Sequence, residues 1–387
     1  MGEPMALSAS DVVLAEGTPE QRQLAWQLNG VSWAPPMPID TYVAREEQLS
    51  QHELCRDGRC KYWVIYLKGY PRQIIASCET TRKTVLIARD GASRKGHGYA
   101  IASVYTNPAY RRLGMAAFLL RRVQEQMDLD SDFSVLYSDI GRSYYSSLGW
   151  RVFPSYQVTL SLVGRAAPPS PTTATSSPPP SPPVPFQHSQ PARTRHLKLG
   201  DLPALCEQDE AHLAQRFAAL PSGGGMTHVA FSPSFAQISW QLTRAEFMAE
   251  RLFGGKAVPN KGAITESGRS WLYWHHDFRE RKLKVLRIVS LLDEADAAAE
   301  QQRIVDIKVL LEAALAEASA WGLTSVLVWD PDEHTTLGCK AAGNTHPEDV
   351  KIVFDERKDK SVPSFRWARG EDSRQTVWED SFYYCWC

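Results

Sequence analysis

The sequence lacks three features that would assign it to a specialised class of protein. Its 387 residues carry a formal net charge of −1, so no excess of one sign draws the chain to nucleic acid or to an anionic membrane surface. No apolar run approaches the roughly 18 residues of a membrane-spanning helix. Residues 1–17 show no basic start followed by an apolar core, so we expect neither a secretory signal nor a transit peptide.

Cysteine is also sparse and irregularly placed. The seven cysteines form an odd count without a repeating framework, which favours free thiols in a reducing compartment over disulfides. Cys55 and Cys60 resemble half of a zinc site, but no second close Cys or His pair follows at the spacing of zinc ligands. We therefore expect free thiols, no metal and a cytoplasmic location.

The remaining composition is that of a soluble globular protein with more than one domain. Hydrophobic residues make up 43% and charged residues 22% of the chain, enough to build a sizeable core. Residues 166–191 are almost purely Pro, Ser, Thr and Ala, a composition that favours an extended linker, with a ligand for a Pro-recognising domain as the alternative. This predicts a domain at 1–165, a linker at 166–192 and a second domain at 193–387.

The first domain shows an alternation of strands and a helix. Residues 61–69, 72–89 and 99–106 have the pattern of strands, and apolar residues at helical spacing follow from 112 to 127. A short apolar strand at 133–138 comes next. A strand, loop, helix, strand order places the two flanking strands parallel through a right-handed crossover, so we expect an α/β fold.

The junction between the strand at 99–106 and the helix has the composition of a phosphate-binding loop. Arg111 and Arg112 supply positive charge, while Gly114 and the small Ala116 allow a diphosphate to approach the backbone amides at the start of the helix. Taken alone the pattern is weak, because any tight strand-to-helix turn selects similar residues.

A second segment strengthens this interpretation. After the strand at 133–138 the chain reads SDIGRSYYSSLGW (138–150), with Tyr145 four residues before Gly149. A helix with buried aromatic residues and a glycine cap would give the same pattern. The two segments together, in this order, resemble the GNAT acetyltransferase superfamily over roughly residues 60–160.

The resemblance implies a mixed sheet flanked by helices and acetyl-CoA as the acetyl donor. It assigns the CoA pyrophosphate to the amides of Arg111, Arg112, Leu113, Gly114, Met115 and Ala116. It assigns the pantetheine arm to the backbone of Val104, Tyr105 and Thr106, and to Ser138, where many members have an asparagine. Tyr145 occupies the position of the tyrosine that protonates or hydrogen-bonds the departing thiolate.

A narrower resemblance concerns the whole chain. The runs LYSDIGRSYYSSLGW and ISWQLTRAEFMAERLFG, with the Trp-rich C-terminal half, are similar to the fungal lysine N6-acetyltransferase family of lysine catabolism. The acceptor it implies is a small-molecule amine, most simply the N6 amine of free L-lysine. An acetyltransferase of a protein lysine or of a secondary-metabolite amine is the alternative within the same chemistry, and a non-catalytic acyl-CoA-binding regulator is the alternative outside it.

The general base is not identified by the sequence. An ammonium group, with an ordinary pKa of about 10.4, must lose a proton before its nitrogen attacks a thioester. Relatives carry a glutamate on the strand that ends at the phosphate loop, but that strand here reads YAIASVYT. The candidates are Glu46, Glu47, Glu79 and Asp139, or water relayed through Ser103 or Tyr105.

The second domain shows the same order of strand, helix and strand as the first, but it lacks the phosphate loop. We expect strands at 269–277, 282–293 and 324–330, and a helix with Ile304, Ile307, Leu311, Leu315 and Ala318 on one face. The corresponding junction carries Asp293, Glu294 and Asp296, which would repel a diphosphate, so this GNAT-like lobe is not expected to bind CoA. The sequence does not report the oligomeric state.

Three smaller features of this half are also interpreted from the sequence. His275 and His276 are adjacent on a strand and point to opposite faces, which favours structural roles over a shared metal. Gly223–Gly225 is expected to be a loop or lid. The aromatic segment 378–387 is expected to be a final strand packed on the sheet. The alternative places the Cys387 carboxylate, or the aromatic residues near it, at the acceptor pocket.

Overall fold

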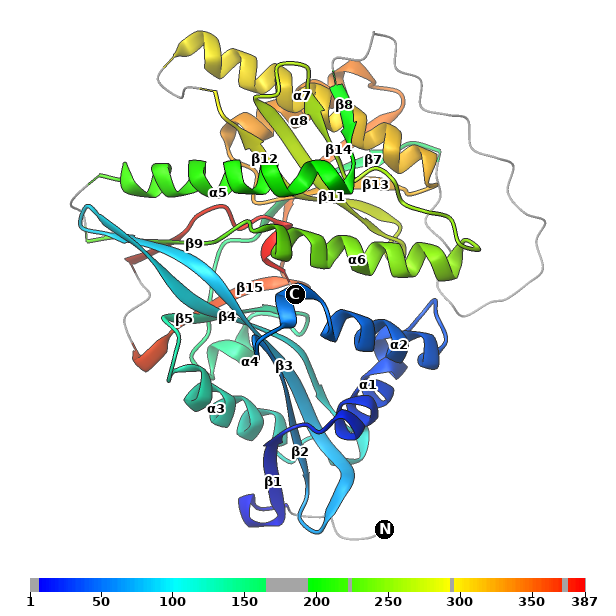
Figure 1. Ribbon diagram of the computed structural model, residues 1–387, viewed down its shortest axis with the longest axis vertical. Coiled ribbons are helices and arrows are strands. Elements are labelled where there is room, and N and C mark those ends of the chain that lie inside the picture. Colours follow the sequence, from blue (N-terminus) through cyan, green and yellow to red (C-terminus); the bar gives the residue numbers. More distant parts are fainter. Residues whose placement is uncertain (1–6, 165–193, 222–224, 293–295, 371–374, 387) are drawn as a thin grey trace.

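The computed structural model describes residues 7–164, 194–221, 225–292, 296–370 and 375–386 of the chain. It contains two sheets with helices on their faces, stacked along the long axis of the molecule (Figure 1). The whole Pro-rich segment 166–191, together with Gly223, Gly224, Asp293, Glu294 and Cys387, lies outside the described residues. Across the described residues, no helix combines the length and the apolarity needed to cross a bilayer.

The first sheet contains strands from both halves of the chain. Its main path runs β1-β2-β3-β4-β5-β15-β6, and β9 and β16 extend it beside the far end of β3. The strands from the first half are β1 (Val12–Glu16), β2 (Cys60–Leu67), β3 (Tyr70–Arg89), β4 (Ala92–Thr106), β5 (Phe133–Ser138) and β6 (Arg151–Val152). Those from the second half are β9 (Thr227–Phe231), β15 (Val362–Trp367) and β16 (Thr376–Trp378).

Helices cover both faces of this sheet because its strands alternate apolar side chains to either side. On β2, Trp63 and Ile65 pack with α3 (Met115–Met127), and Val64 packs with α1 (Pro19–Trp33) on the opposite face. Helix α2 (Ile39–Ser50) lies beside α1, and the short α4 (Ser143–Ser146) precedes β6. The parallel pairing of β4 with β5 confirms the predicted crossover.

The second sheet has the order β14-β7-β13-β12-β11-β10-β8. Its strands are β7 (Tyr156–Leu162), β8 (Thr194–Leu197), β10 (Gly262–Thr265), β11 (Ser270–Asp277), β12 (Lys282–Ser290), β13 (Ser325–Trp329) and β14 (Val350–Glu356). Helices α5 (Leu202–Ala218) and α6 (Phe235–Leu252) lie between the two sheets (Figure 1). The strand-helix-strand order of β12, α7 (Ala297–Ala320) and β13 confirms the predicted second α/β unit.

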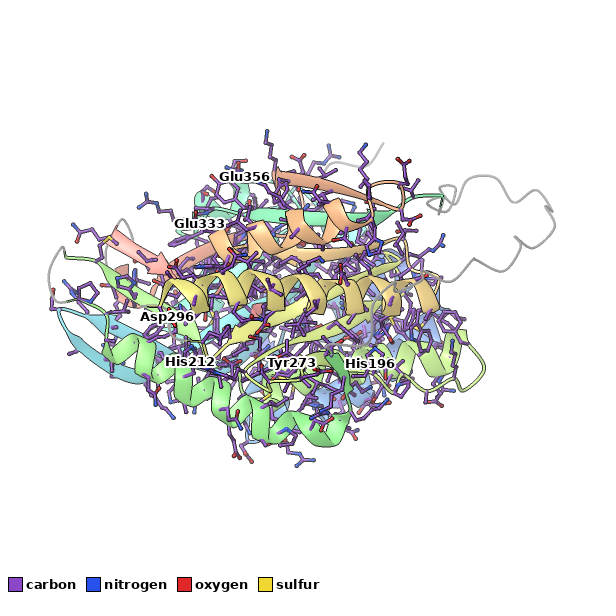
Figure 2. The ribbon with its side chains drawn as sticks, turned by 90° about the horizontal axis from the view of Figure 1, so that it is seen from above. His196, His212, Tyr273, Asp296, Glu333 and Glu356 are labelled. Atoms are coloured by element: carbon purple, nitrogen blue, oxygen red, sulfur yellow. A yellow bond between two sulfur atoms is a disulfide. The ribbon has the colours of Figure 1, made fainter. Side chains whose placement is uncertain are left out.

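Helices α7 and α8 (Glu333–Thr345) pack together on the other face of this sheet. Helix α7 begins after Asp296, whose carboxylate accepts the amide of Ala298 as an N-cap (Figure 2). On the adjacent β11, His276 contacts Glu317 of α7 at 3.0 Å, and His275 contacts the Gln241 carbonyl of α6 at 2.9 Å. The two histidines therefore point to opposite faces, as the sequence predicts.

The two lobes exchange strands. Strand β7 precedes the Pro-rich segment in sequence, yet it pairs with β13 and β14 of the second sheet. Strand β15, close to the C-terminus, pairs with β5 and β6 of the first sheet. Strand pairing thus crosses the boundary expected at residue 165. Strand β7 of the first half belongs to the second sheet, and β9, β15 and β16 of the second half belong to the first sheet.

The C-terminal segment closes a gap in the second sheet. Strand β12 pairs in parallel with β13 only from 282–284 to 325–327, and the strands separate beyond these residues. The ring of Tyr383 fills the gap, with its centroid 4.5 Å from Trp329, and the Lys284 ammonium donates to its hydroxyl at 3.1 Å. The expectation of a final strand over 378–387 was wrong. The observed strand β16 (Thr376–Trp378) ends where that strand was expected to begin, and residues 383–385 form a buried 3-10 turn because their side chains fill this gap.

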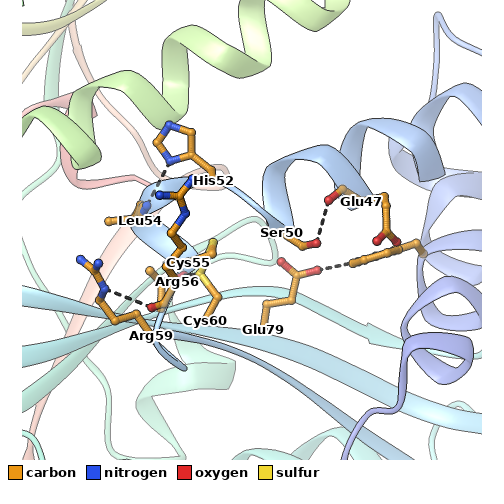
Figure 3. The surroundings of a disulfide bond; sticks show 11 residues. Glu47, Ser50, His52, Leu54, Cys55, Arg56, Arg59, Cys60 and Glu79 are labelled. Carbon is orange, nitrogen blue, oxygen red and sulfur yellow. Dashed lines mark hydrogen bonds between the residues drawn. A yellow bond between two sulfur atoms is a disulfide. The ribbon is translucent and has the colours of Figure 1, made fainter.

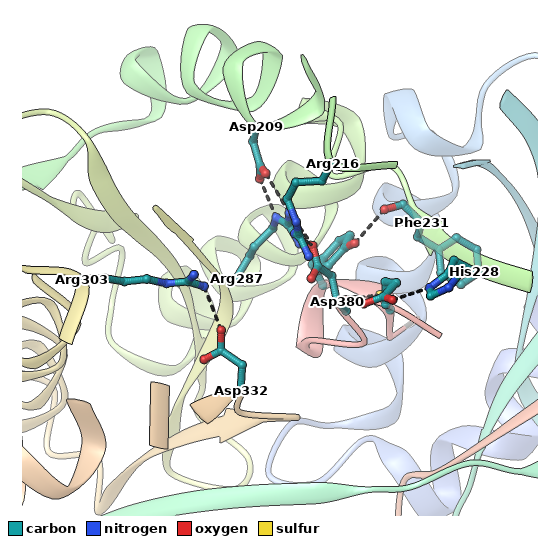
Figure 4. Close-up of polar contacts among 11 residues, drawn as sticks. Asp209, Arg216, His228, Phe231, Arg287, Arg303, Asp332 and Asp380 are labelled. Atoms are coloured by element: carbon teal, nitrogen blue, oxygen red, sulfur yellow. Dashed lines mark hydrogen bonds and ion pairs between the residues drawn. The ribbon is translucent and has the colours of Figure 1, made fainter. Parts of the chain in front are cut away.

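A buried charge cluster fixes this segment in place (Figure 4). The Arg287 guanidinium on β12 donates to both carboxylate oxygens of Asp209 on α5, at 2.6 and 2.8 Å, and pairs with Asp380 at 2.9 Å. Arg216 of α5 binds the same Asp380 carboxylate at 2.9 Å. Because these charges are desolvated, each depends on its partners, and the C-terminal segment is tied to both β12 and α5.

Candidate active site

The site is formed where β4 separates from β5. The two strands pair only from residues 98–101 to residues 133–136. From residue 102 onward β4 keeps β3 as a partner, while no described strand pairs with its other side. An unpaired strand edge offers amides and carbonyls to an extended ligand. The residues predicted to bind the pantetheine arm lie on this open edge: Val104, Tyr105 and Thr106.

A β-bulge in β4 shapes the same edge. Ser77 and Glu79 of β3 face Tyr105 and Ala102, so two residues of β4 oppose one residue of β3. Within the bulge, Ser103 takes a left-handed conformation with a φ of 52°. The bulge turns the Ser103 hydroxyl toward the Glu79 carboxylate, which accepts a hydrogen bond from it.

The loop after β4 has the geometry of an anion-binding turn. Helix α3 begins at Met115, directly after Gly114, which has a φ of 76° and provides no side-chain cap. The first amides of α3 are therefore available to a ligand, as is usual at a helix N-terminus. A side-chain carbon added at Gly114 would meet no atom within 4 Å, so the space above the loop is open. These features fit a CoA pyrophosphate.

The other residues of the predicted loop differ in their exposure and in the groups that they present to a ligand. Arg111 lies over the Tyr105 ring at 5.6 Å and donates to the Thr106 carbonyl at 3.3 Å, so its guanidinium is held beside the open edge. Arg112 is exposed, and Leu113 and Ala116 are partly exposed. The Met115 side chain is buried in the core under α3, which leaves its amide as the group facing the loop.

Ser138 is less suited to the role the resemblance assigns. It ends β5, and its hydroxyl donates to the Gly141 carbonyl at 2.6 Å and accepts from the Ile140 amide at 3.2 Å. A hydroxyl has only one proton to donate. The Ser138 side chain therefore stabilises the turn after β5 and has no proton left for a pantetheine carbonyl, so its contact with CoA stays a prediction that the geometry does not favour.

Tyr145 lies on α4 beside the gap between β4 and β5. Its ring packs edge-on against Tyr144, at 5.1 Å, and against Trp150, at 6.4 Å. Burial, followed by the Tyr144 and Cys78 groups, raises the pKa of Tyr145, so the phenol keeps its proton at neutral pH. A general acid must carry its proton when it reacts, so the protonated phenol is in the state that this role requires.

A small cavity of about 10 Å³, room for a single water molecule, lies on the opposite face of the sheet from Tyr145, against α1. Glu79 lines it together with Trp26, Asn29, Tyr62 and Ser103. The Trp26 indole donates to the Glu79 carboxylate at 3.1 Å, while the side-chain oxygen of Asn29 is buried without a partner among the described residues. Arg22 of α1 also lines the cavity, and its guanidinium lies over the Tyr62 ring at 5.2 Å. The groups left for an ammonium are the Glu79 carboxylate and the unpaired Asn29 oxygen.

The charge state of Glu79 suits proton transfer. Burial, followed by repulsion from the Glu46 carboxylate, raises the pKa of Glu79 to about 8. A carboxyl group with this pKa is much closer to an amine in basicity than an ordinary glutamate, with a pKa of about 4.3. Glu79 therefore has the location and the basicity of a general base for an amine held in the cavity.

The four carboxylates considered from the sequence lie in different places. Glu46 is close to Glu79 and forms an ion pair of 2.5 Å with Arg45. Glu47 faces outward, where its carboxylate accepts from Gln51 at 3.4 Å in an exposed position. Asp139 is exposed and accepts the amide of Ser361 at 2.9 Å. Of these four, Glu46 and Glu79 are brought together beside the open edge of β4.

Three elements of this site were missed from the sequence: Asn29, Trp26 and the bulge at Ser103. The absence of a glutamate from β4 was a signal that another strand supplies the carboxylate. Glu79 on the neighbouring strand β3 lies opposite Ala102 and supplies it to the same place. Finding it needed the register of β3 against β4, which shifts at the bulge. Asn29 and Trp26 come from α1, whose packing angle the sequence does not specify.

The expectation of free cysteines was wrong for one pair. Cys55 and Cys60 form a disulfide that joins the 3-10 turn after α2 (Glu53–Cys55) to the start of β2, close to Glu79 (Figure 3). A count of cysteines cannot reveal such a bond, because the chain brings the two residues together through a turn of a few residues. The four other described cysteines are buried and free. The cytoplasmic location stays a prediction.

Comparison with known proteins assigns this fold and site to a class. A model of the acetyltransferase (GNAT) family matches residues 22–145, which include the open edge and the phosphate loop. The fold and the site thus define a GNAT-type N-acetyltransferase, a family that uses acetyl-CoA. A model described as the LYC1 GNAT-like C-terminal domain matches residues 179–387, and the chain belongs to this family.

Individual relatives agree with this assignment. A protein of Yarrowia lipolytica named lysine acetyltransferase is 24% identical over 295 residues, covering 70% of this chain and 74% of its own. A structure from Enterococcus faecalis described as a probable N-acyltransferase superposes with a TM-score of 0.52 at 12% identity, covering 92% of this chain and 72% of its own. A GCN5-related N-acetyltransferase from Anabaena variabilis gives 0.50 at 14%, covering 92% and 73%. The two structures support the fold alone.

Replacing Gly114 with valine tests the phosphate loop. The side chain would occupy the open space above the first amides of α3, so we expect the Kd for acetyl-CoA to rise about tenfold or more, a loss of about 1.4 kcal/mol. Gly69→Val is the matched control, because Gly69 has a φ of 81° and equally open surroundings in the β2–β3 turn. Both changes impose a left-handed strain of roughly 1–2 kcal/mol. Equal weakening of binding in both variants, measured by calorimetry, would contradict the assignment.

Proposed function

We propose that this N-acetyltransferase acetylates the N6 amine of free L-lysine, or of a closely similar small amine, in a ternary complex with acetyl-CoA. The observation that carries the proposal is the cavity beside the open edge of β4. It offers an ammonium group the Glu79 carboxylate and the unpaired Asn29 oxygen, beside the Trp26 ring. The name of the Yarrowia lipolytica relative supports lysine as the acceptor.

The residues on the two sides of β4 have complementary tasks in this mechanism. Glu79 takes a proton from the ammonium, which frees a lone pair to attack the carbonyl carbon of the thioester. Amides on the open edge of β4 stabilise the charge that develops on the carbonyl oxygen. As the carbon–sulfur bond breaks, Tyr145 gives its proton to the departing thiolate. The nitrogen's second proton leaves after the attack and, through solvent, replaces the proton that Tyr145 gave up, while Glu79 releases the first proton to solvent. The thiol therefore carries one proton, and one proton is released for each acetyl group transferred.

Acetyl transfer to a panel of amines tests the acceptor. Purified protein is mixed with acetyl-CoA and with lysine, a lysine-containing peptide or a bulky metabolite amine, and release of the CoA thiol is followed. We expect the highest kcat/KM with lysine, because the cavity is narrow and enclosed by α1. Turnover with the peptide but not with lysine would contradict the proposal, and tight binding of CoA without thiol release would indicate a regulator.

Replacing Glu79 with glutamine tests the general base. Glu79 must be ionised to accept a proton and its pKa is raised to about 8, so kcat/KM for the amine should rise as the pH increases through 8. In Glu79→Gln this limb should disappear, and kcat/KM should fall by about 10²–10⁴. Glu47→Gln on the outer face of α2 is the control and should keep the wild-type profile. An unchanged pH limb in Glu79→Gln would remove Glu79 from this role.

Replacing Tyr145 with phenylalanine tests the general acid. The phenol acts only when the carbon–sulfur bond breaks, so we expect kcat to fall by about 10² while the Kd for acetyl-CoA changes little. Tyr144→Phe is the matched control, because Tyr144 is the adjacent residue and its ring packs against that of Tyr145. Steady-state kinetics that show equal turnover in wild type and Tyr145→Phe would exclude the role.

A further inference from the structure

One face of α6 connects the C-terminal segment to the acceptor side of the first lobe. The Gln237 and Gln241 side chains donate to the carbonyls of Tyr384 and Trp386, at 2.6 and 2.9 Å. Further along the same face, the sulfur of Met248 accepts from Arg45 of α2 at 3.7 Å. Residues three, four and seven apart share a helix face, so position 244 lies between these two contacts.

Arg244 occupies that position, and its charge, after that of Lys284, helps to lower the pKa of the buried Asp277 carboxylate. Its guanidinium lies over the Trp386 ring, 5.2 Å from the centroid. One terminal nitrogen, Nη1, is buried without a hydrogen-bond acceptor in the part of the chain that the structure describes. The nearby Asp277 carboxylate is bound to the Lys284 ammonium at 2.7 Å. Buried guanidinium groups are normally paired, so this one has the properties of a ligand-binding group.

Arg244 lies one turn of α6 before the contact with α2. At that contact Met248 meets Arg45, whose guanidinium forms an ion pair of 2.5 Å with Glu46. Glu46 is in turn the carboxylate whose repulsion raises the pKa of Glu79, after burial. The face of α6 that carries Arg244 is therefore packed on the helix that carries Glu46.

We propose that Arg244 binds the carboxylate of an amino-acid acceptor while Glu79 receives the amine at the far end of its side chain. This rests on the proposed function and makes Arg244 a specificity-determining residue. A guanidinium can bind a carboxylate through two parallel hydrogen bonds, which fixes the orientation of the ligand as well as its charge. An amine without a carboxylate leaves Arg244 unpaired, so the site selects free amino acids over simple diamines.

The test compares lysine with cadaverine, which has the same chain and terminal amine but no carboxylate. In wild-type protein, kcat/KM should be higher for lysine. In Arg244→Gln, KM for lysine should rise at least about 30-fold, as expected for the loss of one partner of a buried charge pair, while KM for cadaverine should stay the same or fall. Equal losses with both acceptors would overturn the inference.

Arg251→Gln is the matched control. Arg251 lies two turns further along α6, is exposed, and contacts the ring of Phe247 at 5.3 Å. Its replacement should leave the preference for lysine unchanged. If Arg244→Gln lacks a cooperative melting transition, the comparison is made in Arg244→Lys, which keeps the charge but not the two-bond geometry. In that variant KM should still rise for lysine alone, and equal changes with both acceptors would again overturn the inference.

Two further outcomes decide which carboxylate the Arg244 guanidinium binds. Deleting Cys387 should leave the discrimination between lysine and cadaverine intact. If the deletion instead removes it as fully as Arg244→Gln does, the partner of Arg244 is the chain's own terminal carboxylate and the inference is wrong. Failure of the wild-type protein to acetylate lysine would overturn the proposed function, and the inference with it, whereas normal lysine turnover with unchanged discrimination in Arg244→Gln would overturn the inference alone.

Discussion

The separation of β4 from β5 is the constraint on which the rest of the site depends. After residues 101 and 136 the two strands stop pairing, and β15 holds β5 from its other side. The edge of β4 is thereby left without a partner among the described strands in the middle of a sheet, where strand edges are normally satisfied. The phosphate loop continues from this edge, Tyr145 lies on one side of it, and the bulge turns Ser103 toward Glu79 on the other.

The same arrangement occurs in the second lobe, with a different outcome. Strands β12 and β13 also separate after three paired residues, but Tyr383 and its neighbours fill the gap, held by Lys284 and by the buried Arg287 cluster. The position that is open in the first lobe is thus occupied by the chain itself in the second. That the second lobe does not bind CoA stays a prediction.

The features predicted correctly from the sequence are those encoded over short distances. The parallel strands 99–106 and 133–138 and the helix between them each follow from local pattern. The exchange of β7 and β15 between sheets was not predictable, because an isolated strand carries no information about which sheet will accept it. The Cys55–Cys60 bond and the buried turn at 383–385 depend on tertiary contacts in the same way.

The residues of the candidate site also separate into those found in local motifs and those brought together by tertiary contacts. Tyr145 and the loop at 111–116 lie in local motifs, so the sequence located them. The sequence alone did not distinguish Glu79 from the three other carboxylates considered as the general base. The register of β3 against β4, which places Glu79 beside Ser103, made the distinction. No sequence pattern indicated Arg244. Its buried nitrogen, unpaired among the described residues, results from the packing of α6 against α2 and the C-terminal segment, which is a tertiary feature. Ser138 was located by the motif, but its hydroxyl already donates a hydrogen bond within a local turn, so the motif position does not keep its expected role.

Hydrogen exchange measured with and without acetyl-CoA tests the central claim most directly. If the open edge of β4 and the start of α3 bind the donor, exchange should slow at the amides of residues 104–106 and 112–117, while residues 285–290 of β12 stay unaffected. Protection at β12, or none at the first of these segments, would contradict the account. It would mean that the lobe with the filled gap binds the donor, or that the open edge does not.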